Sequence, residues 1–64
     1  MRTSRPIEAL GRFVGVAVDD TRPWRFIAFD PAVHDLDGRR FETLAELRRA
    51  AQATVRRQLP AKAG

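Results

Sequence analysis

The feature that most restricts the fold of this chain is an amphipathic helix in its C-terminal half. The segment Thr43-Leu44-Ala45-Glu46 matches a capping box, in which the threonine hydroxyl accepts a hydrogen bond from the backbone N–H three residues later. Apolar residues then recur close to the helical period, at Leu44, Leu47, Ala51, Val55 and Leu59. Pro60 ends the pattern. The sequence therefore predicts one helix with a single buried face.

A β-hairpin is predicted ahead of this helix. Residues 12–18 (RFVGVAV) are rich in β-branched side chains and residues 24–29 (WRFIAF) are rich in aromatic ones, as strands commonly are. The segment between them, DDTRP, has the composition of a turn. Asp30-Pro31 ends the second strand, because proline cannot donate to the sheet and restricts the residue before it.

The rest of the chain supplies shorter elements. Residues 32–36 fit either a helical turn or a short extended piece, and Asp37-Gly38 is a turn signal that allows positive φ at both positions. Residues 39–41 would follow as a short third strand. The predicted fold class is α+β, a small antiparallel sheet (the β-hairpin plus the short third strand) packed on one C-terminal α-helix. The predicted organisation is a flexible N-terminal arm at 1–9, a single domain at 10–59 and a disordered tail at 60–64.

The register of the hairpin decides which strand face meets the helix. If the five-residue loop closes symmetrically, the residues that flank it, Val18 and Trp24, pair with each other. One face of the hairpin then holds the pairs Val18 with Trp24, Val16 with Phe26 and Val14 with Ala28. The other face holds the pairs Phe13 with Phe29, Gly15 with Ile27 and Ala17 with Arg25. The first set is larger and is expected to face the helix. A slip of one residue would exchange the two faces, so this assignment is conditional on the register.

The second face carries the main functional prediction. One helix covers one face of a small sheet, so Phe13, Ile27 and Phe29 would lie together on an open face, beside Arg25. Apolar side chains of this size that cluster on a surface usually mark a contact with a partner. The alternative is that the N-terminal arm folds over these side chains within one chain.

Length and composition also favour self-association. A chain of 64 residues buries only about 60% of its unfolded surface, and it is marginally stable without a disulfide, a metal or a partner. This chain has no cysteine, and its only histidine, His34, cannot build a zinc site alone. It has no apolar run near the roughly 18 residues that cross a bilayer, and no signal-peptide core. We expect a cytoplasmic protein with no cofactor, no small-molecule substrate and no membrane contact.

The basic residues suggest a second function. The formal net charge is +4, and six arginines fall within or just before the predicted helix: Arg39, Arg40, Arg48, Arg49, Arg56 and Arg57. In a nucleic-acid-binding domain they would contact phosphates, with Phe13 and Phe29 as stacking platforms for bases. The alternative is an ordinary solvated helix face, on which cations near the C-terminus are favoured by the helix dipole.

The sequence contains no convincing catalytic or metal-binding pattern. His34 precedes Asp35 and could act as a base, but the chain has no cysteine or tyrosine, and its only serine is Ser4. The segment Asp35-Leu36-Asp37-Gly38 is similar to part of a calcium loop, yet position 44, where that loop needs glutamate, is leucine. The glycines are too scattered to form a phosphate loop. We therefore predict that the protein is not an enzyme.

The order of elements resembles that of two kinds of small module. The predicted hairpin is followed by Asp-Gly-Arg-Arg-Phe at 37–41, by Thr-Leu-Ala-Glu-Leu at 43–47 and by the helix. This order is similar to that of the arm-type DNA-binding domain of tyrosine recombinases and to that of HicB-type antitoxins. The resemblance covers about residues 12–59. It implies DNA as the partner in the first case and a toxin protein in the second, and it assigns no site residues.

The predicted function is a non-enzymatic interaction module, a homodimer or a small subunit. The residues expected to contact its partner are Phe13, Arg25, Ile27 and Phe29. The alternative prediction is a small basic nucleic-acid-binding domain that uses the six arginines. Both predictions place the function on an exposed surface.

Overall fold

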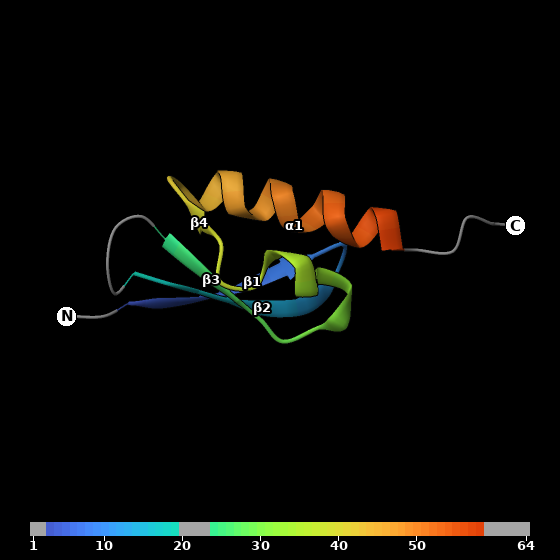
Figure 1. Ribbon diagram of the computed structural model, residues 1–64, viewed down its shortest axis with the longest axis horizontal. Helices are drawn as coiled ribbons and strands as arrows, with labels where there is room; N and C mark the ends of the chain where they lie inside the picture. The colour runs from blue at the N-terminus through green and yellow to red at the C-terminus, as the bar shows by residue number, and fades with distance from the viewer. Residues whose placement is uncertain (1–2, 20–23, 59–64) are drawn as a thin grey trace, which may run out of the picture.

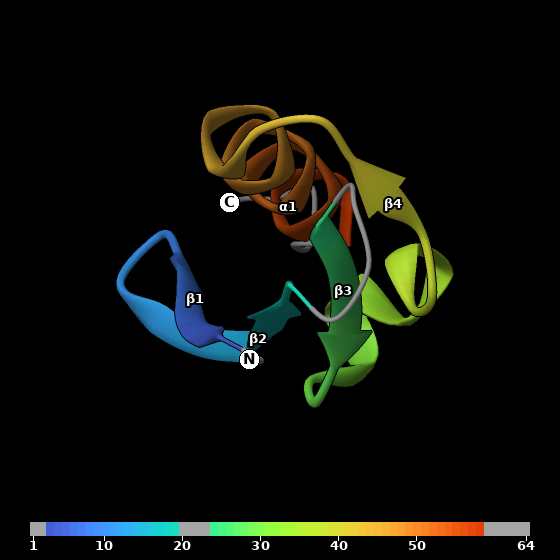
Figure 2. The same cartoon turned by 90° about the vertical axis from the view of Figure 1, so that its left-hand side faces the viewer.

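The computed structural model describes residues 3–19 and 24–58. Its elements are, in chain order, β1 (Ser4–Ala9), β2 (Arg12–Val18), β3 (Trp24–Ala28), the 3-10 helix η1 (Pro31–Leu36), β4 (Arg40–Phe41) and α1 (Leu44–Gln58). The strands form a four-stranded antiparallel sheet in the order β1-β2-β3-β4. Figure 1 shows α1 lying along one face of this sheet, and Figure 2 shows the strands curving beneath the helix. The predicted α+β class is confirmed.

α1 follows the predicted pattern. The Glu46 backbone N–H donates to Thr43 Oγ1 at 3.1 Å, as the capping box requires. The residues of the predicted stripe that the helix buries against the sheet are Leu47, Ala51 and Val55, and Leu44 packs against the edge of this core. Leu59, Pro60 and the predicted tail lie outside the described residues. Local sequence signals thus account for the whole described part of the helix.

The N-terminal segment differs from the prediction. The sequence predicts a flexible arm over residues 1–9, whereas the structure places Ser4–Ala9 in β1; residues 1–2 lie outside the described residues. Ile7 and Ala9 alternate into the core and are fully buried. A two-residue turn at Leu10 and Gly11, with φ of 54° and 82°, joins β1 to β2. Leucine is an unusual residue at positive φ, and this is why the sequence does not indicate the turn.

Pro6 is tolerated because β1 is an edge strand. The Asp19 N–H donates to the Thr3 carbonyl at 2.8 Å, and hydrogen-bonded pairs alternate along an antiparallel ladder. Pro6, which pairs with Val16, therefore occupies a non-hydrogen-bonded position, and its nitrogen faces away from β2. Residues 4–9 widen the sheet and do not fold over its face.

The register between β2 and β3 is one residue away from symmetric closure of the loop. Symmetric closure predicts Val16 opposite Phe26, whereas the structure pairs Val16 with Ile27 and Phe26 with Ala17. By strand alternation, Ala17 then faces the helix and Val16 faces away from it. The predicted inward orientation of Val16 is therefore wrong, and alternation gives Val18 the same outward side although it is buried. Phe26 is buried as predicted.

Gly15 explains why the strands adopt this register. A Cβ atom at this position would clash with the Ile27 carbonyl oxygen and would lie 2.7 Å from Cζ of Phe26, which is closer than real side chains approach. Only glycine allows the fully buried Phe26 ring to lie this close to β2. The largest side chain of the core thus packs against the residue that has none.

A β-bulge at Val14 changes the alternation of β2. Ile7 pairs with Gly15 and Glu8 pairs with Phe13, which leaves Val14 as an extra residue. Its carbonyl accepts the N–H groups of the two residues that follow β3, at 2.9 and 3.2 Å. Val14 is fully buried and Phe13 is exposed, so Phe13 faces away from the helix, as predicted.

The link from β3 to β4 settles the two ambiguous segments. Residues 32–36 belong to the 3-10 helix η1, which begins after the cap residue Asp30. The Arg39 N–H then donates to the Leu36 carbonyl at 3.0 Å across Asp37-Gly38. Gly38 has φ of 82° but Asp37 has φ of −60°, so the prediction of positive φ at both positions is wrong. The predicted third strand is present as β4.

The close packing at Gly15 yields a stability prediction that discriminates between the two registers. We expect Gly15→Ala to lower the free energy of unfolding by about 1–3 kcal/mol, because a methyl group there overpacks the core. Val16→Ala should cost no more than about 1 kcal/mol, because this half-buried side chain faces away from α1. Urea denaturation of both variants at low protein concentration measures the two costs. A larger cost for Val16→Ala than for Gly15→Ala would contradict the observed register.

Candidate interaction surface on the open sheet face

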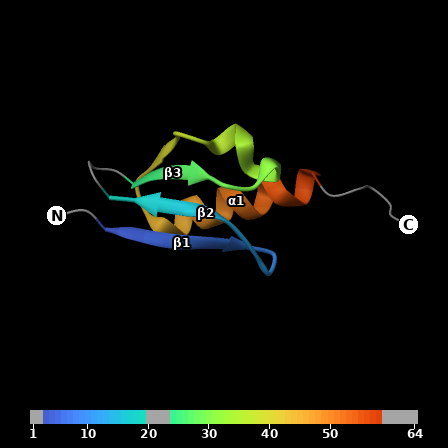
Figure 3. The ribbon, with the colours of Figure 1, turned by 90° about the horizontal axis from the view of Figure 1, so that it is seen from below.

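One face of the sheet lacks a covering layer among the described residues. α1 packs against one side of the sheet, and η1 contacts both β3 and α1 and shares their hydrophobic core. Figure 3 looks onto the other side, called the open face below, with α1 behind the strands. Alternation and the observed register place these residues on the open face: Ser4, Pro6, Glu8, Phe13, Val16, Val18, Arg25, Ile27, Phe29 and Arg40.

The open face is more apolar than a solvated sheet face usually is. Antiparallel sheets with one solvated face normally alternate apolar residues toward the core with polar residues toward water. Here Val16, Val18 and Ile27 lie on the outward side of the two central strands. Val16 and Ile27 are half-buried, whereas Val18 is buried. Phe13 and Phe29 extend this apolar surface toward the Leu10–Gly11 turn.

The two phenylalanine rings are the most exposed apolar groups of the open face. Phe29 exposes 64% of its surface and Phe13 exposes 47%. Their ring centroids lie 5.6 Å apart with an interplanar angle of 85°, an edge-to-face geometry that stabilises aromatic pairs. This contact orients both rings but does not remove them from water. With the half-buried Val16 and Ile27, they form what we call the apolar strip.

Charged residues occupy two diagonally opposite corners of the open face. Glu8 pairs with Phe13 at the end of β1 that leads into the Leu10–Gly11 turn. Arg25 pairs with Arg40 across β3 and β4, at the other end of the strands. These two arginines stand directly opposite one another on neighbouring strands, and neither is without an interaction partner. The acidic corner lies on the far edge strand.

The structure places the predicted partner-contacting residues on one face of the sheet, with Arg25 at the other end of the strands from Phe13 and Phe29. Phe13, Arg25, Ile27 and Phe29 all lie on the open face, although the predicted register between β2 and β3 is wrong. The sequence reasoning missed Val16, Val18 and Glu8 because it assigned both valines to the core and Glu8 to a flexible arm. Alternation within residues 4–9 would have indicated that Glu8 lies on the face opposite Ile7 and Ala9, but Pro6 obscured that pattern.

The six arginines of the nucleic-acid hypothesis do not share one surface. The four on α1, Arg48, Arg49, Arg56 and Arg57, are exposed, whereas Arg40 lies on the open face, on the opposite side of the sheet from the helix. Arg39 precedes β4, and its carbonyl accepts the Phe26 N–H at 2.9 Å. The arginines on α1 form no ion pair with any residue in 3–19 or 24–58.

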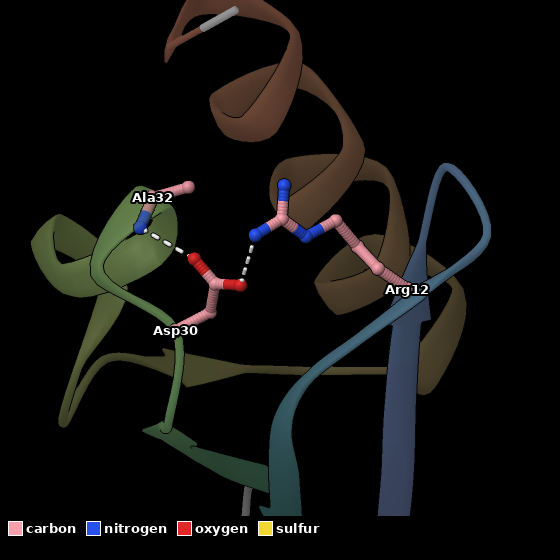
Figure 4. A network of polar contacts seen from close by, with 3 residues as sticks. All are labelled: Arg12, Asp30 and Ala32. Carbon is pink, nitrogen blue, oxygen red and sulfur yellow. Dashed lines mark hydrogen bonds and ion pairs between the residues drawn. The ribbon is translucent and has the colours of Figure 1, made fainter.

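The acidic residues after β3 hold turns together. Figure 4 shows Asp30 between two donors: Arg12 Nη2 donates to one carboxylate oxygen at 2.6 Å, and the Ala32 N–H donates to the other at 2.8 Å. Asp37 Oδ1 accepts the N–H of Ala28 at 2.9 Å, which satisfies a backbone donor at the end of β3. These contacts tie η1 to the sheet.

The neighbourhood of His34 does not form a ligand set. His34 is exposed on η1, and one neighbouring carboxylate, that of Asp37, is engaged with the backbone. Within the part of the chain that the structure describes, no three His, Cys, Asp or Glu side chains lie close enough together to hold a metal ion.

Comparisons with family models, with curated proteins and with solved structures found no match to this chain. The similarity to recombinase arm-type domains and HicB-type antitoxins therefore rests on the order of elements alone. None of the helices in the described residues is both long enough and apolar enough to cross a membrane.

The contacts of Asp30 predict a dependence of stability on pH. The Ala32 N–H, and after it Arg12, lower the pKa of the Asp30 carboxyl below its ordinary value of 3.8. A carboxylate with a lowered folded-state pKa stabilises the fold above its unfolded-state pKa, and it loses this contribution as the pH falls through the folded-state value. We therefore expect Asp30→Asn to lower the free energy of unfolding at pH 7, with the difference from the unmodified protein disappearing below both pKa values.

Urea denaturation at neutral and at strongly acidic pH measures this difference. Asp35→Asn is the matched control, because it removes one carboxylate from an exposed residue of η1. A cost of Asp30→Asn that stays the same at both pH values would contradict the role assigned to the ionised carboxylate.

Proposed function

We propose that this protein is a non-enzymatic interaction module that binds a partner protein through the open face, as a homodimer or as a small subunit. The apolar strip is the observation that supports this function, because Phe13 and Phe29 are exposed while the core lies on the other side of the sheet. Removing apolar surface from water contributes roughly 25 cal/mol per Å². Binding of a partner that covers the strip is therefore favourable, because it removes from water side chains that are already oriented in the free protein.

Contact through the face is favoured over addition of a strand at an edge. The outer edge of β1 contains Pro6, which has no N–H to offer and interrupts pairing with another strand. The other edge is β4, which consists of Arg40 and Phe41 only. A strand added at either edge would form few backbone hydrogen bonds, and these bonds are the source of affinity in that binding mode.

The size of the chain gives the partner a further role. A chain of 64 residues has little stability to spare, so covering the strip would also stabilise the fold by mass action. A chain without cysteine does not depend on a disulfide, so it can fold in a reducing compartment as well as in an oxidising one. The location proposed for this partnership is the cytoplasm.

Site-specific photo-crosslinking tests the proposed face. A photoreactive phenylalanine analogue at position 29 should crosslink to a protein in cells that express the chain, because this position lies in the contact. The same analogue in place of Gln52, an exposed residue of α1, is the matched control and should crosslink much less. Equal yields at the two positions would contradict an interface on the open face, and crosslinked nucleic acid at position 29 would contradict a protein partner.

A second candidate function, nucleic-acid binding, is supported by the four exposed arginines of α1. We expect this function, if present, to appear as binding of duplex DNA or single-stranded RNA at about 50 mM salt that weakens strongly at about 200 mM salt. The double variant Arg49→Gln/Arg56→Gln should reduce the slope of log affinity against log salt by about two, or one per lost phosphate contact. Absence of binding at the lower salt concentration would exclude this candidate.

A further inference from the structure

The side of α1 that faces away from the sheet is basic. Leu47, Ala51 and Val55 hold the opposite side of the helix against the sheet, and Figure 1 shows no other described element above the helix. The exposed arginines of α1 are Arg48, Arg49, Arg56 and Arg57. They form no ion pair within the described residues, so an anionic partner would meet positive charge that no carboxylate neutralises.

These arginines form a central pair with one further arginine on either flank. Arg49 and Arg56 are just under two turns apart at 3.6 residues per turn, so they lie along one line on the outermost side of the helix. Arg48 and Arg57 are about two and a half turns apart, which places them on opposite sides of that line. This arrangement suits a partner with negative charge on both sides of the helix, as the two walls of a nucleic-acid groove have.

The other residues of the outer side are small or polar. Ala45 and Ala53 are exposed there, and their short side chains let a surface approach the helix closely. Gln52 is also exposed, and a glutamine amide can form paired hydrogen bonds with the major-groove edge of adenine. Glu46, the acidic residue of α1, lies in the first turn, so its repulsion of phosphates is confined to one end of the helix.

The dimensions of the helix fit duplex DNA better than RNA. α1 has 15 residues, so it is about 22 Å long, and an α-helix with its side chains is about 10–12 Å wide. The major groove of B-DNA is about 12 Å wide and admits an α-helix, whereas that of duplex RNA is too narrow and deep for side chains to read. Proteins that bind single strands stack the bases on aromatic rings, and α1 has no aromatic residue.

On the basis of the second candidate function, we infer that α1 binds duplex DNA in the major groove. Its four arginines contact phosphates on the two walls of the groove, and Gln52 faces the edges of the bases. The open face lies on the opposite side of the sheet, so the protein partner proposed above and the DNA can be bound at the same time. The chain then links a protein to DNA.

Fluorescence anisotropy of the full chain with labelled duplexes tests this inference. The probes are a DNA duplex of about 24 base pairs and mixed sequence, a duplex RNA of the same sequence, and the same DNA with glucosylated 5-hydroxymethylcytosine in place of cytosine. The glucose is neutral and fills the major groove, so it blocks the groove without changing the charge of the duplex. At about 50 mM salt, we expect the unmodified DNA to bind at least about tenfold more tightly than either of the other probes.

Variants locate the contact on the protein. Arg49→Gln should weaken binding of the unmodified DNA several-fold at about 50 mM salt, because one phosphate contact is lost. Arg40→Gln is the matched control, since it makes the same charge change on the open face, and it should alter the affinity by less than about twofold. Phe29→Ala should leave the affinity unchanged, because stacking on the open face plays no part in this mode of binding. Circular dichroism establishes that each variant is folded.

Several outcomes would overturn the inference. Binding of the glucosylated DNA or the duplex RNA as tightly as the unmodified DNA would contradict the major-groove contact, and an equal effect of Arg49→Gln and Arg40→Gln would contradict the role of α1. Absence of binding to every probe would exclude the second candidate function as well. None of these results changes the protein contact proposed for the open face, which crosslinking at position 29 tests separately.

Discussion

The arrangement of this molecule depends on the close approach of β2 and β3 at Gly15. The Phe26 ring lies where a side chain at position 15 would otherwise stand, and a Cβ atom there would also meet the Ile27 carbonyl. This packing fixes the register, and the register decides which side chains of β2 face the helix. In this register Gly15 and Ala17 face the helix, and the valines at positions 16 and 18 take the other side. The composition of the open face is thus a consequence of how the core is packed.

The parts of the fold that the sequence predicted are those set by local interactions. The capping box and the apolar stripe of α1 involve residues three or four apart, so pattern alone was sufficient. The register of the hairpin depends on contacts between strands, and alternation fits either register equally well. β1 was missed because its turn uses Leu10 at positive φ, where Asn or Gly would have been the recognisable residue.

The predicted contact residues lie on one face of the sheet because two effects cancel. The shift of one residue exchanges the faces of residues 15–18, but the bulge at Val14 reverses the alternation again before Phe13. Arg25 and Ile27 were assigned correctly because the larger Trp24 and Phe26 indicated which side of β3 faces the core. Val16 and Val18 lie within the shifted stretch, and they are the residues that the prediction placed on the wrong face.

Strand propensity offers a simpler account of part of the open face. β-branched residues are favoured in strands even where they meet water, so Val16, Val18 and Ile27 alone would not indicate a partner. Phe29 is a stronger sign than these three residues, because it follows the last residue of β3 and its N–H bonds to the Val14 carbonyl, yet its large ring does not enter the core. It exposes 64% of its surface and packs edge-to-face against Phe13. A large ring that the core does not use is the feature of this surface that most favours the proposed contact outside the chain.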